Sequence, residues 1–411
     1  MSRFRMVALG LGLSSTACQG WSEGQVVDSI TSPPRPPYFA PSITAAYGNA
    51  SLVYTHNFAS LRASRFALPW AAPETVGPQT SYLHTHAVTI GGDGVTTTLF
   101  TSAGAMSWSR FASGAWTVPA TLDSMGHRPS LAADGTGNVL GVWVSGDEVR
   151  ASRYLVGSGW GPVESLNRGA LELRSLGVAM NPSGVGVAAW CEERLDGSHI
   201  VAHRFEPDSG WSDATDLASV PACARSSPTF EYLQDRSTVV VGISDAGVPT
   251  VLWTDGDLKL RRQTLVPSPT WALPVSLTSS GRVFNPRLAV NGGNDAIAVW
   301  QYDGAGEMLL RARRFSSSAA TWSAVNTISP HQPFRSAELA VSIDDAGRGM
   351  VAFIEGGVAT TVRYDGTAFQ PSEALGVRGD YELALAMNRA GTAYLVRAWA
   401  QRDVLVHTFF P

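Results

Sequence analysis

Short apolar runs separated by glycine-rich turns fill most of the chain, and their order repeats. Eight segments open on Gly or Asn, and seven of them place an aromatic residue six positions later. The segments are GNASLVY (48–54), GVTTTLF (94–100), GNVLGVW (137–143), GVGVAAW (184–190), GVPTVLW (247–253), NDAIAVW (294–300), GRGMVAF (347–353) and GTAYLVR (391–397). Because Gly and Asn tolerate positive φ, each start marks a tight turn between two strands.

Two further elements follow most of these hairpins. The third carries an arginine near its end, namely Arg65, Arg110, Arg153, Arg204, Arg314 and Arg363. The fourth pairs an aromatic with an aliphatic residue six positions later, an even spacing that puts both on one face of a strand. These pairs are Trp70/Val76, Trp116/Leu122, Trp160/Leu166, Trp211/Leu217, Trp271/Leu277, Trp322/Ile328 and Phe369/Leu375. We interpret the repeated aromatics and arginines as packing between sheets, with stacked sugar sites as the alternative.

Four short strands per repeat, at spacings of 43 to 63 residues, predict an all-β fold, an eight-bladed β-propeller of four-stranded blades. Seven blades are the alternative. The blades are expected at about 42–77, 84–123, 129–167, 175–218, 237–278, 286–329, 337–376 and 381–410. Residues 18–411 would form this single domain, with a proline-rich connector at 31–41 and an insertion at 218–237.

The last repeat lacks a fourth strand, because the sequence ends after VLVHTFFP. An open propeller would expose an unpaired strand edge, which invites aggregation. Trp21 and Val27 reproduce the fourth-strand spacing near the other terminus. We therefore expect residues 20–30 to complete blade eight beside residues 404–410.

The N-terminal residues predict export. Residues 1–17 have a signal peptide's order: Arg3 and Arg5, an apolar run at 6–13, then small residues. SSTAC (14–18) resembles a bacterial lipobox, which implies a lipid on Cys18 and an outer-membrane or cell-surface location. Ordinary cleavage nearby, with a periplasmic or secreted protein, is the alternative.

Composition narrows the partners and the state of the cysteines. The formal charge is −4, so we expect no nucleic-acid partner. In an oxidising compartment Cys191 and Cys223 are expected to pair and to pin the long insertion. Two buried free thiols are the alternative. We expect a monomer, with a glycan or an envelope protein as partner.

Loops are where a propeller displays functional residues. Connections between consecutive repeats carry candidate anion ligands: Arg128, Arg174, Arg282, Arg335, Arg378, His127 and His331. Guanidinium groups there could hold carboxylates, sulfates or phosphates, and solvated loop arginines are the alternative. Glu192, Glu193 and Asp196 are weak catalytic candidates for glycoside hydrolysis. DGD (255–257) and DGAGE (303–307) only faintly suggest Ca²⁺, so no metal site and no cofactor is expected.

The turns DSGW (208–211), GSGW (157–160) and SGAW (113–116) resemble degenerate Asp-boxes of sialidase-like propellers and turns of fucose-binding propeller lectins. The resemblance implies the fold and suggests glycans as ligands, and it transfers no catalytic residue. We expect a non-enzymatic, lipid-anchored envelope propeller that binds a glycan or protein on its loop face. A carbohydrate-active enzyme, hydrolase or lyase, and a structural component of an envelope complex are the alternatives.

Overall fold

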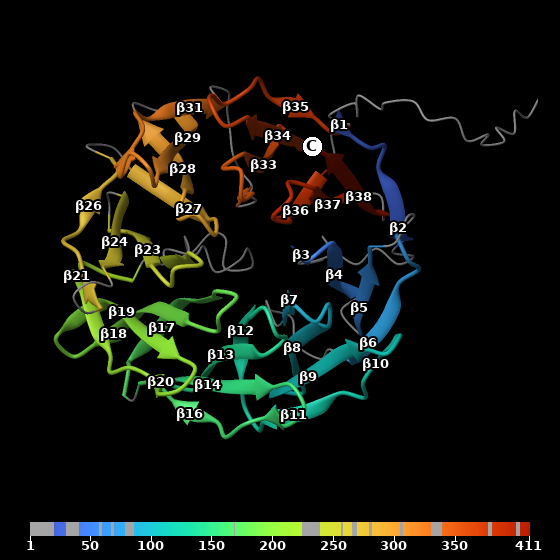
Figure 1. The fold of residues 1–411 in the computed structure, drawn as a ribbon, viewed down its shortest axis with the longest axis vertical. Coiled ribbons are helices and arrows are strands. Elements are labelled where there is room, and N and C mark those ends of the chain that lie inside the picture. The colour runs from blue at the N-terminus through green and yellow to red at the C-terminus, as the bar shows by residue number, and fades with distance from the viewer. Residues whose placement is uncertain are drawn as a thin grey trace, which may run out of the picture.

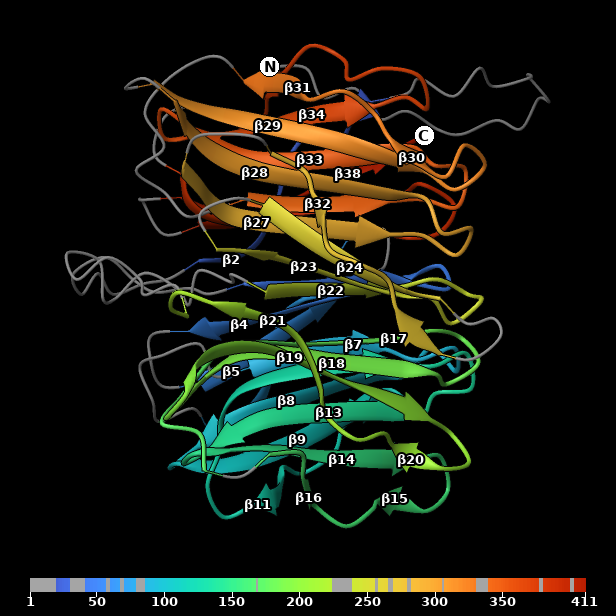
Figure 2. The same ribbon diagram turned by 90° about the vertical axis from the view of Figure 1, so that its left-hand side faces the viewer.

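The computed structural model places eight antiparallel sheets in a ring around a central channel, which confirms the eight-bladed propeller (Figure 1). It describes residues 20–29, 41–56, 60–66, 70–78, 86–167, 169–223, 239–255, 258–264, 269–278, 282–304, 307–329, 339–376, 380–399 and 403–411. In each sheet the first strand, A, lies beside the channel, and strands B, C and D follow outward (Figures 1 and 2). No helix in the described part of the chain has the length and hydropathy needed to cross a membrane.

The first four blades follow the repeat closely. Blade 1 contains β3 (Ser42–Ala46), β4 (Asn49–His56), β5 (Ser60–Arg65) and β6 (Glu74–Pro78). Blade 2 contains β7 (His86–Ile90), β8 (Thr96–Ser102), β9 (Ala105–Ala112), β10 (Ala115–Trp116) and β11 (Ala120–Asp123). Blade 3 contains β12 (His127–Ala133), β13 (Val139–Ser145), β14 (Glu148–Leu155), β15 (Gly159–Trp160) and β16 (Glu164–Ser165). Blade 4 contains β17 (Glu172–Met180), β18 (Gly186–Arg194), β19 (Gly197–Glu206), β20 (Gly210–Trp211) and β21 (Thr215–Val220).

The last four blades complete the propeller. Blade 5 contains β22 (Val239–Ile243), β23 (Pro249–Thr254), β24 (Leu258–Thr264), β25 (Thr270–Trp271) and β26 (Val275–Ser276). Blade 6 contains β27 (Arg282–Val290), β28 (Ala296–Gly304), β29 (Glu307–Ser316), β30 (Thr321–Trp322) and β31 (Asn326–Ser329). Blade 7 contains β32 (Leu339–Ile343), β33 (Gly349–Glu355), β34 (Val358–Tyr364) and β35 (Glu373–Ala374). Blade 8 contains β36 (Asp380–Met387), β37 (Ala393–Trp399), β38 (Asp403–Phe410), β1 (Gly20–Trp21) and β2 (Gln25–Ser29).

The N-terminal segment closes the propeller, as the sequence predicts. Strands β1 and β2 both pair antiparallel with β38, so the blue and red ends of the chain lie side by side (Figure 1). Trp21 lies opposite Phe409, with the ring centroids 5.5 Å apart, and its Nε1 donates to Thr361 Oγ1 of blade 7 at 3.2 Å. The segment therefore joins blade 8 to its neighbour as well as completing it.

Strand D is bent, so the expectation that its aromatic and aliphatic residues share one face of a straight strand is wrong: Trp211 packs between blades 3 and 4, and Leu217 between blades 4 and 5. In blade 3, Trp160 pairs with Tyr154, and four residues later Glu164 pairs with Ala151, only three residues back along strand C. One residue of strand D is therefore unpaired, which is a β-bulge. Because the same offset recurs in six blades, β10/β11, β15/β16 and their equivalents are short pieces of one bulged strand.

Strand-C arginines fasten each blade to the next. Six of them place the guanidinium over the strand-C aromatic ring of the following blade, at 3.3–5.9 Å from the ring centroid. The pairs are Arg65/Phe111, Arg110/Tyr154, Arg153/Phe205, Arg262/Phe315, Arg314/Tyr364 and Arg363/Phe409. The large strand-B side chains, among them Trp143, Trp190 and Trp253, are fully buried between sheets. Both observations support the packing interpretation of the repeated residues.

The turns between strands A and B form a hydrogen-bonded belt around one end of the channel. A buried Asn or Asp begins most of them, and its side-chain oxygen accepts a backbone N–H four residues later, as in Asn181 with Val185 at 2.9 Å. Neighbouring turns are tied through the backbone: Gly92 N–H donates to Asp134 C=O at 2.9 Å and Asp345 N–H to Arg389 C=O at 3.1 Å. A Cβ on Gly92 would lie 1.9 Å from Gly135 O, so only glycine allows this approach.

Candidate functional site

Strands A line two cavities, one toward each end of the channel. The end formed by the connections from strand D to the next strand A, the D–A end, holds a cavity of about 430 Å³ that includes Ser42, His86 and Arg287. The opposite end, formed by the A–B turns, holds a cavity of about 450 Å³ that includes Tyr47, Asp245, Asp345 and Arg389. Cavities of these volumes match the usual range for small-molecule sites, ~300–1,000 Å³.

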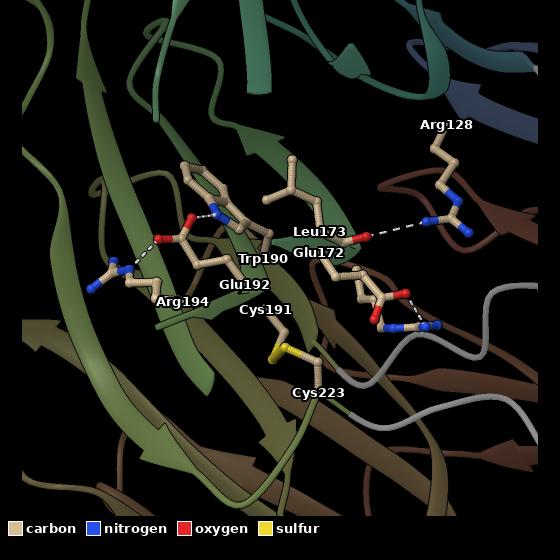
Figure 3. Close-up of a disulfide and its surroundings, with 9 residues drawn as sticks. Arg128, Glu172, Leu173, Trp190, Cys191, Glu192, Arg194 and Cys223 are labelled. Carbon is tan, nitrogen blue, oxygen red and sulfur yellow. Dashed lines mark hydrogen bonds and ion pairs between the residues drawn. A yellow bond between two sulfur atoms is a disulfide. The ribbon is translucent and has the colours of Figure 1, made fainter. Parts of the chain in front are cut away.

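Two of the predicted anion-binding arginines lie at the D–A end and contact protein groups. Arg128 donates from Nη1 to the carbonyl of Leu173 in blade 4 at 3.2 Å (Figure 3). Arg174 forms an ion pair with Glu172. His127 begins β12 opposite Val144. His331, Arg335, Arg378 and the side chain of Arg282 lie outside the described residues. An anion site at this end of the channel stays a prediction.

The predicted acidic cluster surrounds the B–C turn of blade 4. Glu192 is 4% exposed and accepts hydrogen bonds from Trp190 Nε1 at 2.6 Å and Asn167 Nδ2 at 3.0 Å, and it also pairs with Arg194 (Figure 3). Asp196 is exposed and lies 3.2 Å from His199 Nε2. Glu193 lies half-buried opposite Glu172 in the sheet. Glu192 thus serves the interface between blades 3 and 4, and a catalytic role for the cluster stays a prediction.

The predicted disulfide is confirmed. Cys191 in β18 is bonded to Cys223, just after β21, with the Cα atoms 5.7 Å apart (Figure 3). Both residues are fully buried among apolar side chains of blades 4 and 5. The bond therefore anchors the start of the insertion, whose residues 224–238 lie outside the described structure.

The two faint Ca²⁺ motifs lie in the B–C turns of neighbouring blades, 5 and 6, and Ca²⁺ binding there stays untested. Asp255 forms an ion pair with the Nζ of Lys259 at 2.8 Å, and Asp303 lies near the end of β28 in the next blade. Residues 256–257 and the side chain of Glu307 lie outside the described structure. Among the residues that it describes, no three His, Cys, Asp or Glu side chains are grouped to hold a metal ion.

The A–B end carries a feature that the sequence reading missed, an exposed tyrosine in a strained turn. Tyr47 and Gly48 form the two-residue loop between Ala46 and Asn49, with φ values of 51° and 78°. Positive φ at both positions is the type I′ geometry, which favours Asn-Gly. A bulky residue in left-handed backbone costs about 1–2 kcal/mol. Because Tyr47 is 46% exposed, burial of its ring does not offset much of this cost.

Arg389 reaches across the same opening. Its turn belongs to blade 8, yet its guanidinium binds both oxygens of Asp245 in blade 5, with Nη1 to Oδ2 at 2.8 Å. It also contacts Asp345 of blade 7 at 3.4 Å. The side chain therefore extends across the channel opening, from blade 8 toward blade 5. We call Tyr47, Asp245, Asp345 and Arg389, with the cavity they line, the A–B mouth.

The turn belt holds these residues in place. Asn181 Nδ2 donates to the carbonyl of Asp245 at 2.9 Å, and the N–H of Asp245 donates to Gly292 C=O at 3.1 Å. The backbone of Asp345 is bonded to that of Arg389, as described above. The three charged side chains thus start from rigid turns, which reduces the entropy lost when a ligand binds.

Local electrostatics fix the protonation states in the mouth. The hydrogen bonds that Arg389 donates to Asp245 raise the pKa of Arg389 above its usual range, so the guanidinium stays charged. Burial raises the pKa of Tyr47, although Arg389 acts in the opposite direction, so the phenol stays neutral. The mouth therefore offers two carboxylates, one guanidinium, one neutral hydroxyl and an aromatic ring.

A sequence signal for this site exists, although it is slight. In blades 3 to 8 the A–B turn begins with a buried Asn, Asp or Ser, and the residue after it is Gly135, Pro182 or Gly292 in three of these blades. The three charged exceptions are Asp245, Asp345 and Arg389. Tyr47 replaces the Asn that its turn geometry favours.

No family model matches the chain, and neither does any curated protein. Solved structures of β-propellers do resemble it. The polysaccharide lyase Uly1 is 12% identical, with a TM-score of 0.48 over 95% of this chain and 94% of that one. A PL25 ulvan lyase is 10% identical, with a TM-score of 0.48 over 85% and 96% of the two chains. The six-bladed fucose-recognising lectin of Aleuria aurantia is 12% identical, with a TM-score of 0.43 over 83% and 99%. At these identities the likeness concerns the fold, and the chain is an eight-bladed β-propeller protein.

Proposed function

We propose that the protein is a non-enzymatic carbohydrate-binding propeller that receives part of a glycan at the A–B mouth. The observation that carries this proposal is Tyr47, an exposed aromatic residue held in costly backbone geometry beside a cavity of about 450 Å³. Strain of this kind gathers at functional sites. An aromatic ring next to fixed charged groups suits a sugar, which has apolar C–H faces and hydroxyl donors.

The chemistry of the mouth favours binding over catalysis. Arg389 is paired with both carboxylates of the mouth. Carboxylates accept hydrogen bonds from the hydroxyl groups of a sugar, so this arrangement suits binding. The enzyme alternative at Glu192 is not favoured, because three protein groups already occupy that carboxylate.

The cellular setting belongs to the same proposal. We place the protein in a bacterial cell envelope, exported through residues 1–17 and anchored by a lipid on Cys18, in the outer membrane or at the surface. The disulfide between Cys191 and Cys223 supports export, since such bonds persist in oxidising compartments. Mass spectrometry of the N-terminal peptide tests the anchor: a diacylglyceryl-modified Cys18 is expected, and an unmodified residue would contradict it.

Glycan-array binding by the purified full chain tests the function. Tyr47→Asn keeps a residue that tolerates left-handed backbone and should lose array binding by about tenfold or more. Leu195→Ala is the matched control, because Leu195 is 94% exposed in the B–C turn of blade 4, at the opposite end of the strands. Binding that is lost in the control and kept in Tyr47→Asn would overturn the assignment of the site.

A further inference from the structure

We infer that the glycan bound at the A–B mouth carries a positive charge, as a hexosamine chain with free amino groups does. The inference rests on the proposed function and adds the charge of the ligand to it. Three observations support it: the balance of charge in the mouth, the long contacts of the Asp345 carboxylate, and the ring of Tyr47, which lines the same cavity.

The eight A–B turns are acidic as a set. They contain six carboxylates and two guanidiniums, namely Asp93, Asp134, Asp245, Asp295, Asp344, Asp345, Arg348 and Arg389. Arg110 and Arg314 of strand C pair with Asp93 and Asp295. Arg204 and Arg262 of strand C also reach these turns, at the carbonyls of Gly247 and Asn294, so six guanidiniums balance the six carboxylates over the whole set. Within the A–B mouth itself, the carboxylates of Asp245 and Asp345 face the guanidinium of Arg389, a formal excess of one negative charge that favours a cation over an anion.

One of the two carboxylates in the mouth is weakly engaged. Asp345 has two contacts, from Arg389 Nη1 and from the N–H of Gly292, and both measure 3.4 Å. Strong charge-assisted hydrogen bonds are shorter, at ~2.7–2.9 Å. Its side chain is 42% exposed. Asp245, by contrast, is bound by two guanidinium nitrogens, so Asp345 is the acceptor that a ligand can reach at least cost.

Tyr47 completes a site for an ammonium group. An aromatic ring attracts a cation over its face, and ammonium ligands are recognised by aromatic rings together with carboxylates. Tyr47 lines the same cavity as Asp345. A hexosamine offers one ammonium group per sugar for Asp345 and an apolar ring face for the tyrosine.

An anionic glycan fits the mouth poorly. A uronate or sulfate bound to Arg389 would lie close to the two carboxylates that Arg389 already pairs with, Asp245 and Asp345. Placing like charges together costs several kcal/mol in an interface. The structure thus separates a cationic sugar from an acidic one on electrostatic grounds.

Calorimetric titration of the purified full chain with three oligosaccharides tests the inference. The probes are a β-1,4-linked glucosamine hexamer, its fully N-acetylated form and a glucuronic-acid-containing hexamer. At a pH near 6, where the amines are charged, the glucosamine hexamer should bind at least about tenfold more tightly than the N-acetylated form. The preference should shrink in about 1 M salt, which screens charge.

Substitutions separate this inference from the proposed function. Asp345→Asn should remove most of the preference for the amine, while Asp365→Asn, an exposed carboxylate in the C–D turn of blade 7, should leave it unchanged. Equal binding of the amine and N-acetyl forms, still lost in Tyr47→Asn, would overturn the charge inference and keep the proposed function. Failure of every sugar to bind would overturn both. Hexalysine binding as tight as the glucosamine hexamer would show that charge alone is read, and would overturn the sugar assignment.

Discussion

Arg204 donates from Nη1 to Oε1 of Gln263 at 2.8 Å across the interface between blades 4 and 5. At six other blade interfaces, the equivalent arginine lies over an aromatic ring. Gln263 replaces the strand-C aromatic of blade 5, and the arginine of blade 4 keeps a partner by hydrogen bonding instead. At the eighth interface Thr408 replaces the arginine, and Phe66 packs against Tyr394 at 4.9 Å. Each departure from the repeat is therefore matched by its neighbour across the interface.

Gln263→Leu should destabilise the propeller. The change leaves the guanidinium of Arg204, whose side chain is 10% exposed, without that acceptor. Loss of a buried hydrogen bond to a charged group costs about 1–3 kcal/mol. Urea unfolding gives the free energy directly. Val118→Ala, at a side chain that is 88% exposed, is the control and should change it by less than about 0.5 kcal/mol.

Trp21→Ala should weaken closure of the propeller. It removes the contact with Phe409 and the hydrogen bond to Thr361. Because the indole is half-buried, we expect a loss somewhat below the ~3–5 kcal/mol typical of core tryptophans. Thermal unfolding measures it. An unchanged melting temperature would mean that Trp21 is only a spacer after Cys18.

Acid should loosen the contact between the closing strand and blade 1. Asp28 of β2 accepts from Tyr54 Oη at 2.6 Å and Arg62 Nη1 at 2.9 Å, and it lies 3.1 Å from His56 Nδ1. Burial acts to raise the pKa of Asp28, but the hydrogen bonds from Tyr54 and Arg62 outweigh it and lower the pKa. Burial also lowers the pKa of His56.

Both shifts have the same consequence for stability. A group whose folded pKa is lowered stabilises the fold above its unfolded pKa and loses that effect as pH falls. Stability should therefore begin to fall below about pH 6.5 through His56, and again below about pH 4 through Asp28. Asp28→Asn should flatten the second step in a series of urea unfolding curves. If the loss of stability below about pH 4 is as large in this variant as in the wild-type chain, Asp28 does not cause it.

Reduction of the disulfide should destabilise the protein. The bond between Cys191 and Cys223 closes a chain segment with a sequence separation of 32 residues. Bonds of this kind contribute about 2–4 kcal/mol, chiefly by restricting the unfolded chain. The double variant Cys191→Ala/Cys223→Ala should unfold at a correspondingly lower urea concentration, and dithiothreitol should have no further effect on it.

The fold was predictable from the sequence because its signals are local and repeated. The spacing of Trp21 and Val27 alone indicated where the closing strand would pair. The site was not predictable in the same way. Arg389 and Asp245 are separated by 144 residues and meet only because the propeller places blades 8 and 5 around one opening. Nothing in the local pattern of either turn indicates its partner.

The chosen loop face shows the same limit. The sequence pattern predicts a binding site at the D–A connections, where arginines are frequent. In the structure, Arg128 contacts Leu173 and Arg174 contacts Glu172. The strain at Tyr47 required backbone angles, because "YG" at a turn shows only that a turn is present. The sequence thus indicates which residue types could form a site, but only the folded structure shows which of them lie close together.

The central claim is that Tyr47 occupies a strained turn because its aromatic ring binds a ligand. The direct measurement compares the wild-type chain with Tyr47→Asn in both urea unfolding and calorimetric titration with the glucosamine hexamer. The account predicts opposite effects: the free energy of unfolding rises by up to about 1 kcal/mol, because Asn suits the type I′ turn, while binding weakens by about tenfold or more. Binding of unchanged affinity in the variant would contradict the account.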